Sequence, residues 1–189
     1  MEAAGSEGDF EAGALLLAAP TLLDPNFRRS VVLVCEHNYE GSFGLIVNRP
    51  LPFRSETLDE VLGENATTIA FGGPVQPNTL HYLHRLPEAI PDAAPVANGI
   101  FWGGSFDHVR DAANVGTLTD QQLRFFLGYA GWGAGQLQAE ISNSDWIVAS
   151  LGVDRIFEVE AEKLWSLAMR KLGGEYAMLA NYPTDPRLN

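Results

Sequence analysis

Residues 20–50 read PTLLDPNFRRSVVLVCEHNYEGSFGLIVNRP, and the fold prediction for this chain starts from them. Two apolar runs, Val31 to Cys35 and Gly44 to Val47, flank the segment HNYEGS. Short apolar runs on either side of Asn and Gly are typical of a β-hairpin with a longer loop. We therefore predict that the two runs pair as antiparallel strands.

This pairing gathers basic side chains at the open end of the hairpin. It sets Asn48 and Arg49 beside Ser30, with Arg28 and Arg29 just before it. Arginine binds carboxylate or phosphate groups through two parallel hydrogen bonds, so the functional interpretation is a pocket for an anionic ligand or a partner's carboxylate. The alternative is that these arginines pair with acidic residues on their own surface.

Glu36 and His37 lie at the loop end of the hairpin, where a carboxylate and an imidazole could act as an acid–base pair. Adjacent strand residues point to opposite faces, which argues against convergence on one substrate atom. The alternative is a structural histidine that bonds its own loop. The pairing also puts about 17 Å between this end and Asn48 to Arg49, at about 3.4 Å per residue. One compact site therefore cannot use both ends.

Size and composition predict a cytoplasmic globular protein. The chain has 189 residues, of which 46% are hydrophobic and 19% charged. We expect residues 1–12 to form a flexible acidic tail and residues 13–189 to form a single α+β domain. The one cysteine, Cys35, suits a reducing compartment. The apolar run from Ala14 to Leu23 is interrupted by Pro20 and is too short to span a membrane.

Net charge limits the choice of partner. Twelve basic and 24 acidic residues give a net charge of -12, which repels phosphate backbones and anionic lipid at long range. We therefore expect an unidentified protein or a small anionic ligand as the partner. Direct nucleic-acid binding and membrane association are not expected.

Strands are expected mainly in the first half of the chain and helices in the second. Further apolar runs bounded by Gly, Pro and Asn predict strands at 13–19, 68–71, 80–86, 95–102 and 146–149. Helices are predicted at 58–62, 105–113, 119–130, 161–172 and 175–181. Residues 136–141 fit either state, and we favour helix. The predicted class is α+β, with one mixed sheet partly curled on itself.

Two glycine-containing segments could take part in binding. Gly72 and Gly73 follow a predicted strand and could expose amides to an anion, although such pairs more often turn the chain or admit close backbone packing. Trp132 stands among three glycines, and Gln136 and Glu140 would share one helix face. These side chains could meet a ligand together, or Trp132 could simply dock into the core.

No pattern in the sequence predicts a catalytic residue, a metal site or a cofactor. His81 and His84 have an H-x-x-H spacing, but on a strand they face opposite ways. Cys35 follows a buried run and has no cationic neighbour to activate its thiol. Neither glycine pair has the spacing of a nucleotide-binding loop.

Three separated motifs resemble the YqgE/AlgH family of bacterial proteins: GALLLAAPTLLDPNFRRSVVLVCEHNYEGSFGLIVNRPL from residue 13, FGGPV at 71–75, and FFLGYAGWGAGQLQAEI at 125–141 followed by Trp146. The resemblance implies a bifurcated, partly barrel-like sheet surrounded by helices. Some members carry the label of transcriptional regulator. The family has no agreed catalytic residues to transfer, and its motif positions here are Glu36, His37, Asn48, Arg49, Gly72, Gly73, Trp132, Gln136 and Trp146.

The leading hypothesis is a non-enzymatic domain that binds a ligand or a protein, with a regulatory role. The rival hypotheses are an enzyme of unrecognised type that uses Glu36 and His37, and a DNA-binding regulator, which would need a basic face that this composition hardly permits. The primary candidate site residues are Arg28, Arg29, Asn48, Arg49, Gly72 and Gly73. The secondary candidates are Glu36, His37, Trp132, Gln136 and Glu140.

Overall fold

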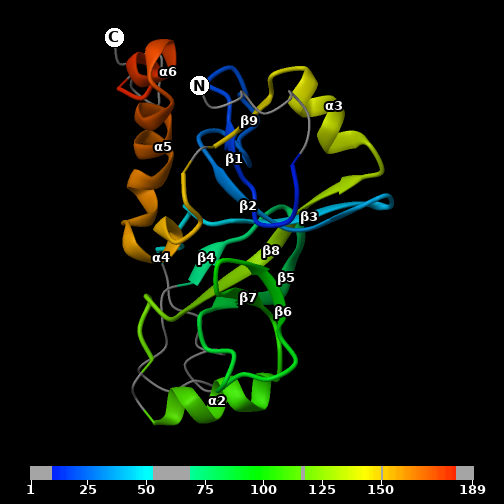
Figure 1. The fold of residues 1–189 in the computed structure, drawn as a ribbon, viewed down its shortest axis with the longest axis vertical. Coiled ribbons are helices and arrows are strands. Elements are labelled where there is room, and N and C mark those ends of the chain that lie inside the picture. The colour runs from blue at the N-terminus through cyan, green and yellow to red at the C-terminus, as the bar shows by residue number, and fades with distance from the viewer. Residues whose placement is uncertain (1–9, 53–68, 116–117, 150, 182–189) are drawn as a thin grey trace.

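The computed structural model describes residues 10–52, 69–115, 118–149 and 151–181, in which nine strands form one sheet (Figure 1). The strands are β1 (Leu15–Ala18), β2 (Val31–Asn38), β3 (Gly41–Ile46), β4 (Ile69–Phe71), β5 (Val75–His84), β6 (Ala94–Ala97), β7 (Ile100–Trp102), β8 (Leu123–Gly133) and β9 (Trp146–Val148). The helices are α2 (Phe106–Asn114), α3 (Gln136–Ser142), α4 (Arg155–Glu158), the 3-10 turn η1 (Ala161–Lys163), α5 (Leu164–Leu172) and α6 (Gly174–Leu179).

The sheet forks at its longest strand, β8. The strand order is β6-β7-β5-β8-β3-β2-β1-β9, and β4 joins β8 outside this path. The first part of β8 pairs with β5 and, in parallel, with β4, whereas its last part, from Ala130 to Gly133, pairs with β3. A mixed, bifurcated sheet in an α+β protein is therefore confirmed.

The sheet curls without closing. Gly13, just before β1, approaches Ala97 of β6 so closely that a Cβ atom on the glycine would lie 2.5 Å from the Ala97 Cβ. The path of paired strands nevertheless ends at β6 on one side and β9 on the other. The expectation of a partly barrel-like sheet is therefore not supported, because a barrel requires its last strand to pair with its first.

The hairpin predicted from residues 20–50 is present. β2 and β3 pair antiparallel, with Leu33 opposite Leu45 and His37 opposite Ser42, and a bulge follows Val34. Successive side chains of β2 pack on alternate faces of the sheet, which is why the run is apolar throughout. The loop end of the hairpin projects from the rest of the molecule (Figure 1).

Three clusters of buried side chains hold the layers together. On one face of the hairpin, Leu33 and Leu45 lie in a cluster with Trp165 and Met169 of α5. On the other face, Val32 and its neighbours pack with side chains from α3, β9 and Phe10. A third cluster packs α2 against β5 and β8. Figure 1 shows α5 and α6 beside β1, α3 near β9, and α2 at the opposite end.

The predicted helix at 119–130 is wrong, because Leu123–Gly133 forms β8. The residues of the expected capping box make only a turn, in which the Thr119 carbonyl accepts from the amides of Gln122 and Leu123. Apolar residues at i, i+3, i+4 and i+7 also occur in a strand that is buried on both faces. The segment pairs with β5 on one edge and with β3 and β4 on the other, so sheet pairing on both edges stabilises the strand.

Most other elements lie close to their predicted positions. Residues 136–141 are helical as favoured, and 95–102 divides into β6 and β7 around a turn at Asn98 and Gly99. The predicted helices at 105–113, 161–172 and 175–181 correspond to α2, to η1 with α5, and to α6. The helical turn at 58–62 falls outside the described residues. No helix among the described residues is long and apolar enough to cross a membrane.

Gly73 is the glycine for which the fold predicts the clearest cost of substitution. It has a φ of +153°, and a Cβ atom there would lie 2.1 Å from the carbonyl carbon of Tyr129. Gly73→Ala should lower the free energy of unfolding by about 2–4 kcal/mol, measured by urea denaturation. Gly152→Ala is the matched control, because nothing lies within 4 Å of its added Cβ. Equal stability of the two variants would contradict this packing.

Candidate functional site

A pocket of about 670 Å³ lies where the open end of the β2–β3 hairpin meets α5 and α6. We call it the arginine pocket. The described residues that line it are Arg28, Arg29, Asn48, Arg49, Glu162, Trp165, Ser166, Arg170, Ala180 and Asn181. The hairpin register thus brings together four of the primary candidates, as the sequence predicted.

Asn48 fixes the backbone of this pocket. Its side chain is buried, its Oδ1 accepts from the Val31 amide at 2.7 Å, and its Nδ2 donates to the Arg29 carbonyl at 2.9 Å. Arg29 has a φ of 55°, a left-handed conformation that a residue without a branched Cβ tolerates at some cost. Asn48 therefore uses its amide to hold this turn in place.

Arg49 is held by backbone carbonyls. Its Nη1 donates to the Asn26 carbonyl at 2.6 Å and its Nη2 donates to the Arg28 carbonyl at 2.9 Å. Burial lowers the pKa of Arg49, the charge of Arg28 lowers it further, and Asp24 acts in the opposite direction. The guanidinium stays charged because arginine is protonated in proteins.

Arg29 lies over the ring of Trp165, with its guanidinium carbon 4.9 Å from the ring centroid. The indole Nε1 of Trp165 donates to the Ala18 carbonyl at 2.9 Å, so α5 is tied to β1 behind the pocket. Burial lowers the pKa of Arg29, and the charge of Arg28 adds to the effect. Arg28 therefore repels both of its arginine neighbours.

Positive charge exceeds negative charge in this pocket. Four arginines line it, against one described carboxylate, Glu162. Arg170 donates to Oδ1 of Asn181 at 3.0 Å. Within the described part of the chain, no ion pair joins Arg28, Arg49 or Arg170 to a carboxylate. Arg49 nevertheless interacts electrostatically with the nearby carboxylate of Asp24, without forming an ion pair.

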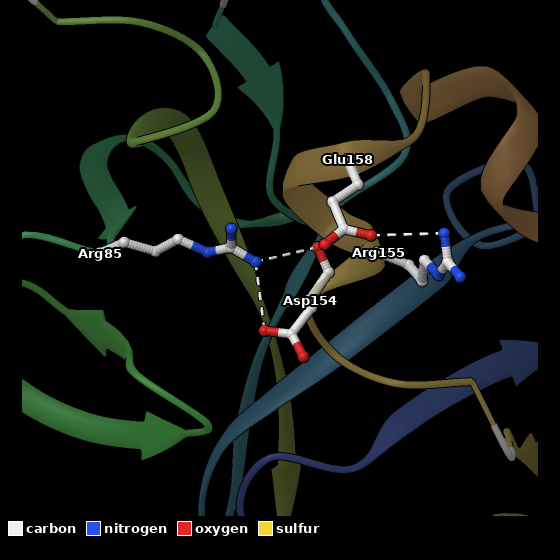
Figure 2. A network of polar contacts seen from close by, with 4 residues as sticks. All are labelled: Arg85, Asp154, Arg155 and Glu158. Carbon is white, nitrogen blue, oxygen red and sulfur yellow. Dashed lines mark hydrogen bonds and ion pairs between the residues drawn. The ribbon is translucent and has the colours of Figure 1, made fainter.

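Arginines elsewhere in the molecule do pair with acids. Figure 2 shows Arg85 donating to Oδ1 of Asp154 at 3.1 Å, beside an ion pair of 3.3 Å between Arg155 and Glu158. The Arg85 guanidinium also lies 4.9 Å from the centroid of the Phe157 ring. Arg85 and Arg155 thus form ion pairs with carboxylates of this acidic chain. The arginine pocket differs, because its described residues include four arginines and one carboxylate.

Gly72 and Gly73 lie outside the arginine pocket. The Gly72 amide donates to the Leu127 carbonyl at 2.7 Å, and the Gly72 carbonyl accepts from the Ile46 amide at 2.8 Å. Any Cβ atom at either position would overlap the backbone of β8. The described amide of Gly72 is therefore used by the sheet, and both glycines allow backbone segments to approach closely.

Glu36 and His37 have separate surroundings. The Nδ1 of His37 is 2.7 Å from the Ser42 hydroxyl, and its ring centroid is 4.3 Å from that of buried Phe10, a residue within the predicted tail. Glu36 instead accepts from Nδ2 of Asn38 at 2.8 Å. The histidine thus bonds its own hairpin, and the two side chains do not converge.

Glu140 joins the remaining secondary candidates in one network. Its Oε2 accepts from the indole Nε1 of Trp132 at 2.8 Å and from that of Trp146 at 2.9 Å, while its Oε1 accepts from Nε2 of Gln136 at 2.9 Å. The Gln136 Oε1 in turn accepts from the Gly133 amide at 3.0 Å. These contacts tie α3 to β8 and β9, so the network explains the Trp-Gly segment as packing.

The histidines of β5 do not share a site. The Nδ1 of His84 accepts from the Leu86 amide at 3.1 Å, and its Nε2 lies 3.0 Å from the Gly103 carbonyl. His81 lies instead among aromatic rings. Over the described residues, no group of three His, Cys, Asp or Glu side chains could hold a metal ion. Burial raises the pKa of the Cys35 thiol.

Sequence reasoning missed the half of the arginine pocket that the C-terminal helices supply. The sequence predicts the helix at 161–172, which contains Trp165, but no pattern pairs that helix with the hairpin. Arg170 gives no signal in the sequence, because a lone cation near a helix end is usually solvated, and Asn181 gives none either. The packing of α5 against β1, and of α6 against α5, brings these residues to the pocket.

Removing the Glu140 carboxylate should destabilise the protein, because two indole N–H groups would lose their acceptor. We expect Glu140→Ala to lower the free energy of unfolding by about 2–4 kcal/mol and to change the near-UV circular dichroism of the tryptophans. Glu175→Ala, on exposed α6, is the control and should change stability by less than about 0.5 kcal/mol. If both variants unfold at the same urea concentration, the network does not stabilise the fold.

Comparisons with known proteins agree with this architecture. The chain is 44% identical to a UPF0301 protein of Chlorobaculum tepidum, over 94% of this chain and 95% of that protein. It is 40% identical to a UPF0301 protein of Cytophaga hutchinsonii, over 94% of this chain and 98% of the relative.

Two solved structures are similar as well. The solution structure of the AlgH protein from Pseudomonas aeruginosa has a TM-score of 0.70 and 29% identity, over 97% of this chain and 98% of that one. A crystal structure of a protein from Corynebacterium diphtheriae has a TM-score of 0.73 at 22% identity, over 94% and 95% of the chains, and shows the same fold. The AlgH-like family model matches residues 15–177. The chain therefore belongs to the AlgH-like family.

Proposed function

We propose that this protein is a non-enzymatic binding protein and that the arginine pocket holds an anionic group, a carboxylate or a phosphate. The observation that carries the proposal is the convergence of Arg28, Arg49 and Arg170, none of which makes an ion pair within the described residues, on one hollow of a chain whose net charge is -12. In such a protein, cations are expected to be neutralised by the surrounding acids. A site that keeps them together favours an anion.

The electrostatics of the pocket support an anionic ligand. Burial and the charge of Arg28 both lower the pKa of Arg29 and of Arg49, which means that Arg28 repels each of these two cations. A bound anion would attract all three guanidinium groups and so offset this repulsion. Two backbone carbonyls already order the Arg49 guanidinium in the free protein, so ligand binding loses less side-chain conformational entropy there.

Binding fits the pocket better than catalysis does. The one hydroxyl among its described lining residues, Ser166 Oγ, donates to the Lys163 carbonyl at 3.1 Å, and no histidine lies beside it to act as a base. The rival enzyme hypothesis depends on Glu36 and His37, whose side chains have different neighbours. The two side chains therefore do not face one common position at which a substrate could react.

The proposal extends to the setting in which the protein works. We place it in the cytoplasm, which is consistent with one buried cysteine, and we assign it a regulatory role in which binding of the anion alters capture of a protein partner. The anion belongs either to a small metabolite or to the partner itself. Direct nucleic-acid binding is not part of the proposal, because of the net charge.

The test measures binding of inorganic phosphate and of citrate at low ionic strength, by two-dimensional NMR of the ¹⁵N-labelled protein. The indole N–H of Trp165 reports on the pocket, because Arg29 lies over its ring. Arg28→Gln should weaken binding at least about fivefold without unfolding the protein, since the Arg28 side chain is exposed. Arg110→Gln, a cation of α2 paired with Asp107, is the control and should change nothing.

The two sources of the anion differ in affinity. Tight saturable binding of citrate or phosphate would favour a small ligand, whereas weak binding confined to the arginine pocket would favour a group carried by a larger partner. The proposal would be refuted by an absence of shifts at Trp165 with either anion. Equal losses in the Arg28→Gln and Arg110→Gln variants would also refute it.

A further inference from the structure

A second hollow, of about 510 Å³, lies at the projecting end of the β2–β3 hairpin, away from the arginine pocket. We call it the acidic hollow. Its lining includes the carboxylate residues Glu36 and Glu40, which we call the rim, the aromatic residues Phe43 and Tyr129, which we call the wall, and the glycines Gly41 and Gly131. None of the described residues that line it carries a positive charge.

The strand register explains how these residues come to share one face of the sheet. Glu36 lies opposite Phe43 on β2 and β3, and Phe43 lies opposite Gly131 on β3 and β8. Directly opposed residues point to the same face, and Tyr129 is two residues from Gly131 on the same strand. Carboxylate, phenyl ring and phenol therefore line one surface, while His37 lies on the other with Phe10.

Two glycines of the acidic hollow lie close to neighbouring groups. A Cβ atom on Gly131 would lie 3.0 Å from Cε2 of Tyr129, so the tyrosine ring covers this glycine. A Cβ atom on Gly41 would lie 2.2 Å from the Trp132 carbonyl oxygen. A side chain at position 41 would therefore clash with the backbone, and one at position 131 would displace the Tyr129 ring.

The rim and the wall are both ordered. Asn38 donates from Nδ2 to Oε1 of Glu36 at 2.8 Å and accepts at Oδ1 from the Glu40 amide at 2.8 Å, which ties the two acidic positions together. The Phe43 and Tyr129 ring centroids are 5.0 Å apart. Behind them, His81 packs against both rings, and burial lowers its pKa, so the wall adds no positive charge at neutral pH.

We propose that the acidic hollow binds a lysine or arginine side chain presented by a partner protein. Carboxylates at the rim complement the charge of such a side chain, and aromatic faces attract cations and cover an alkyl stem. The hairpin projects from the molecule (Figure 1). Tyr39, in the turn between β2 and β3, is 87% exposed. An exposed tyrosine beside an open hollow favours a polypeptide lying along the hairpin over a small enclosed cation.

The test uses the ¹⁵N-labelled full chain and three probes: a capped peptide of sequence GSKSG, the same peptide with norleucine in place of lysine, and tetramethylammonium. Binding to the acidic hollow should shift the amide signals of Gly41 and Gly131 with the lysine peptide and not with the norleucine peptide. The double variant Glu36→Gln, Glu40→Gln should weaken the response at least about fivefold. Glu88→Gln, at another exposed carboxylate, is the matched control.

Each outcome decides the proposal. Saturable shifts that depend on the lysine charge and on the two rim carboxylates support it. Equal shifts with the norleucine peptide, no shifts at Gly41 and Gly131, or tighter binding of tetramethylammonium than of the peptide would overturn it. Since Glu36 and Glu40 are exposed, the variants should keep the wild-type pattern of other amide signals, which checks that they remain folded.

Discussion

The structure depends on the antiparallel pairing of β2 with β3 in one register. Because Val32 lies opposite Ile46, the apolar side chains of both strands divide cleanly between the two faces of the sheet. A shift of one residue would exchange these faces. Asn48 locks the open end by bonding Val31 and Arg29, so the same register positions the arginines. The loop end carries the opposite charge, and the hairpin therefore has two chemically distinct ends.

Part of this arrangement could be predicted from the sequence. Continuous apolar runs with an Asn- and Gly-containing loop specify a hairpin, and counting residues back from the loop places Arg49 near Arg28. The same reasoning failed at Thr119, where a capping pattern and helical spacing preceded β8. Local propensity cannot report that two sheet edges, β5 and β3, are open on either side of that segment. Tertiary pairing decides the conformation of such a run.

In the candidate site too, local sequence patterns predict one part and tertiary packing decides the other. The hairpin half of the arginine pocket follows from the register, whereas Trp165 and Arg170 arrive through the packing of α5, which no local pattern encodes. Gly72, which follows a predicted strand, and Trp132, which stands among three glycines, are candidate binding residues in the sequence. Their surroundings instead reflect packing: a close approach of two backbones in one case and a carboxylate shared by two indoles in the other.

A crystal structure of the protein grown at low ionic strength with citrate or phosphate tests the central claim most directly. The proposed function requires the anion to lie in the arginine pocket, with its oxygen atoms within hydrogen-bond distance of the Arg28 and Arg49 guanidinium groups. An empty arginine pocket in crystals that hold the anion elsewhere would contradict it, as would a register of β2 and β3 that separates Asn48 from Arg29.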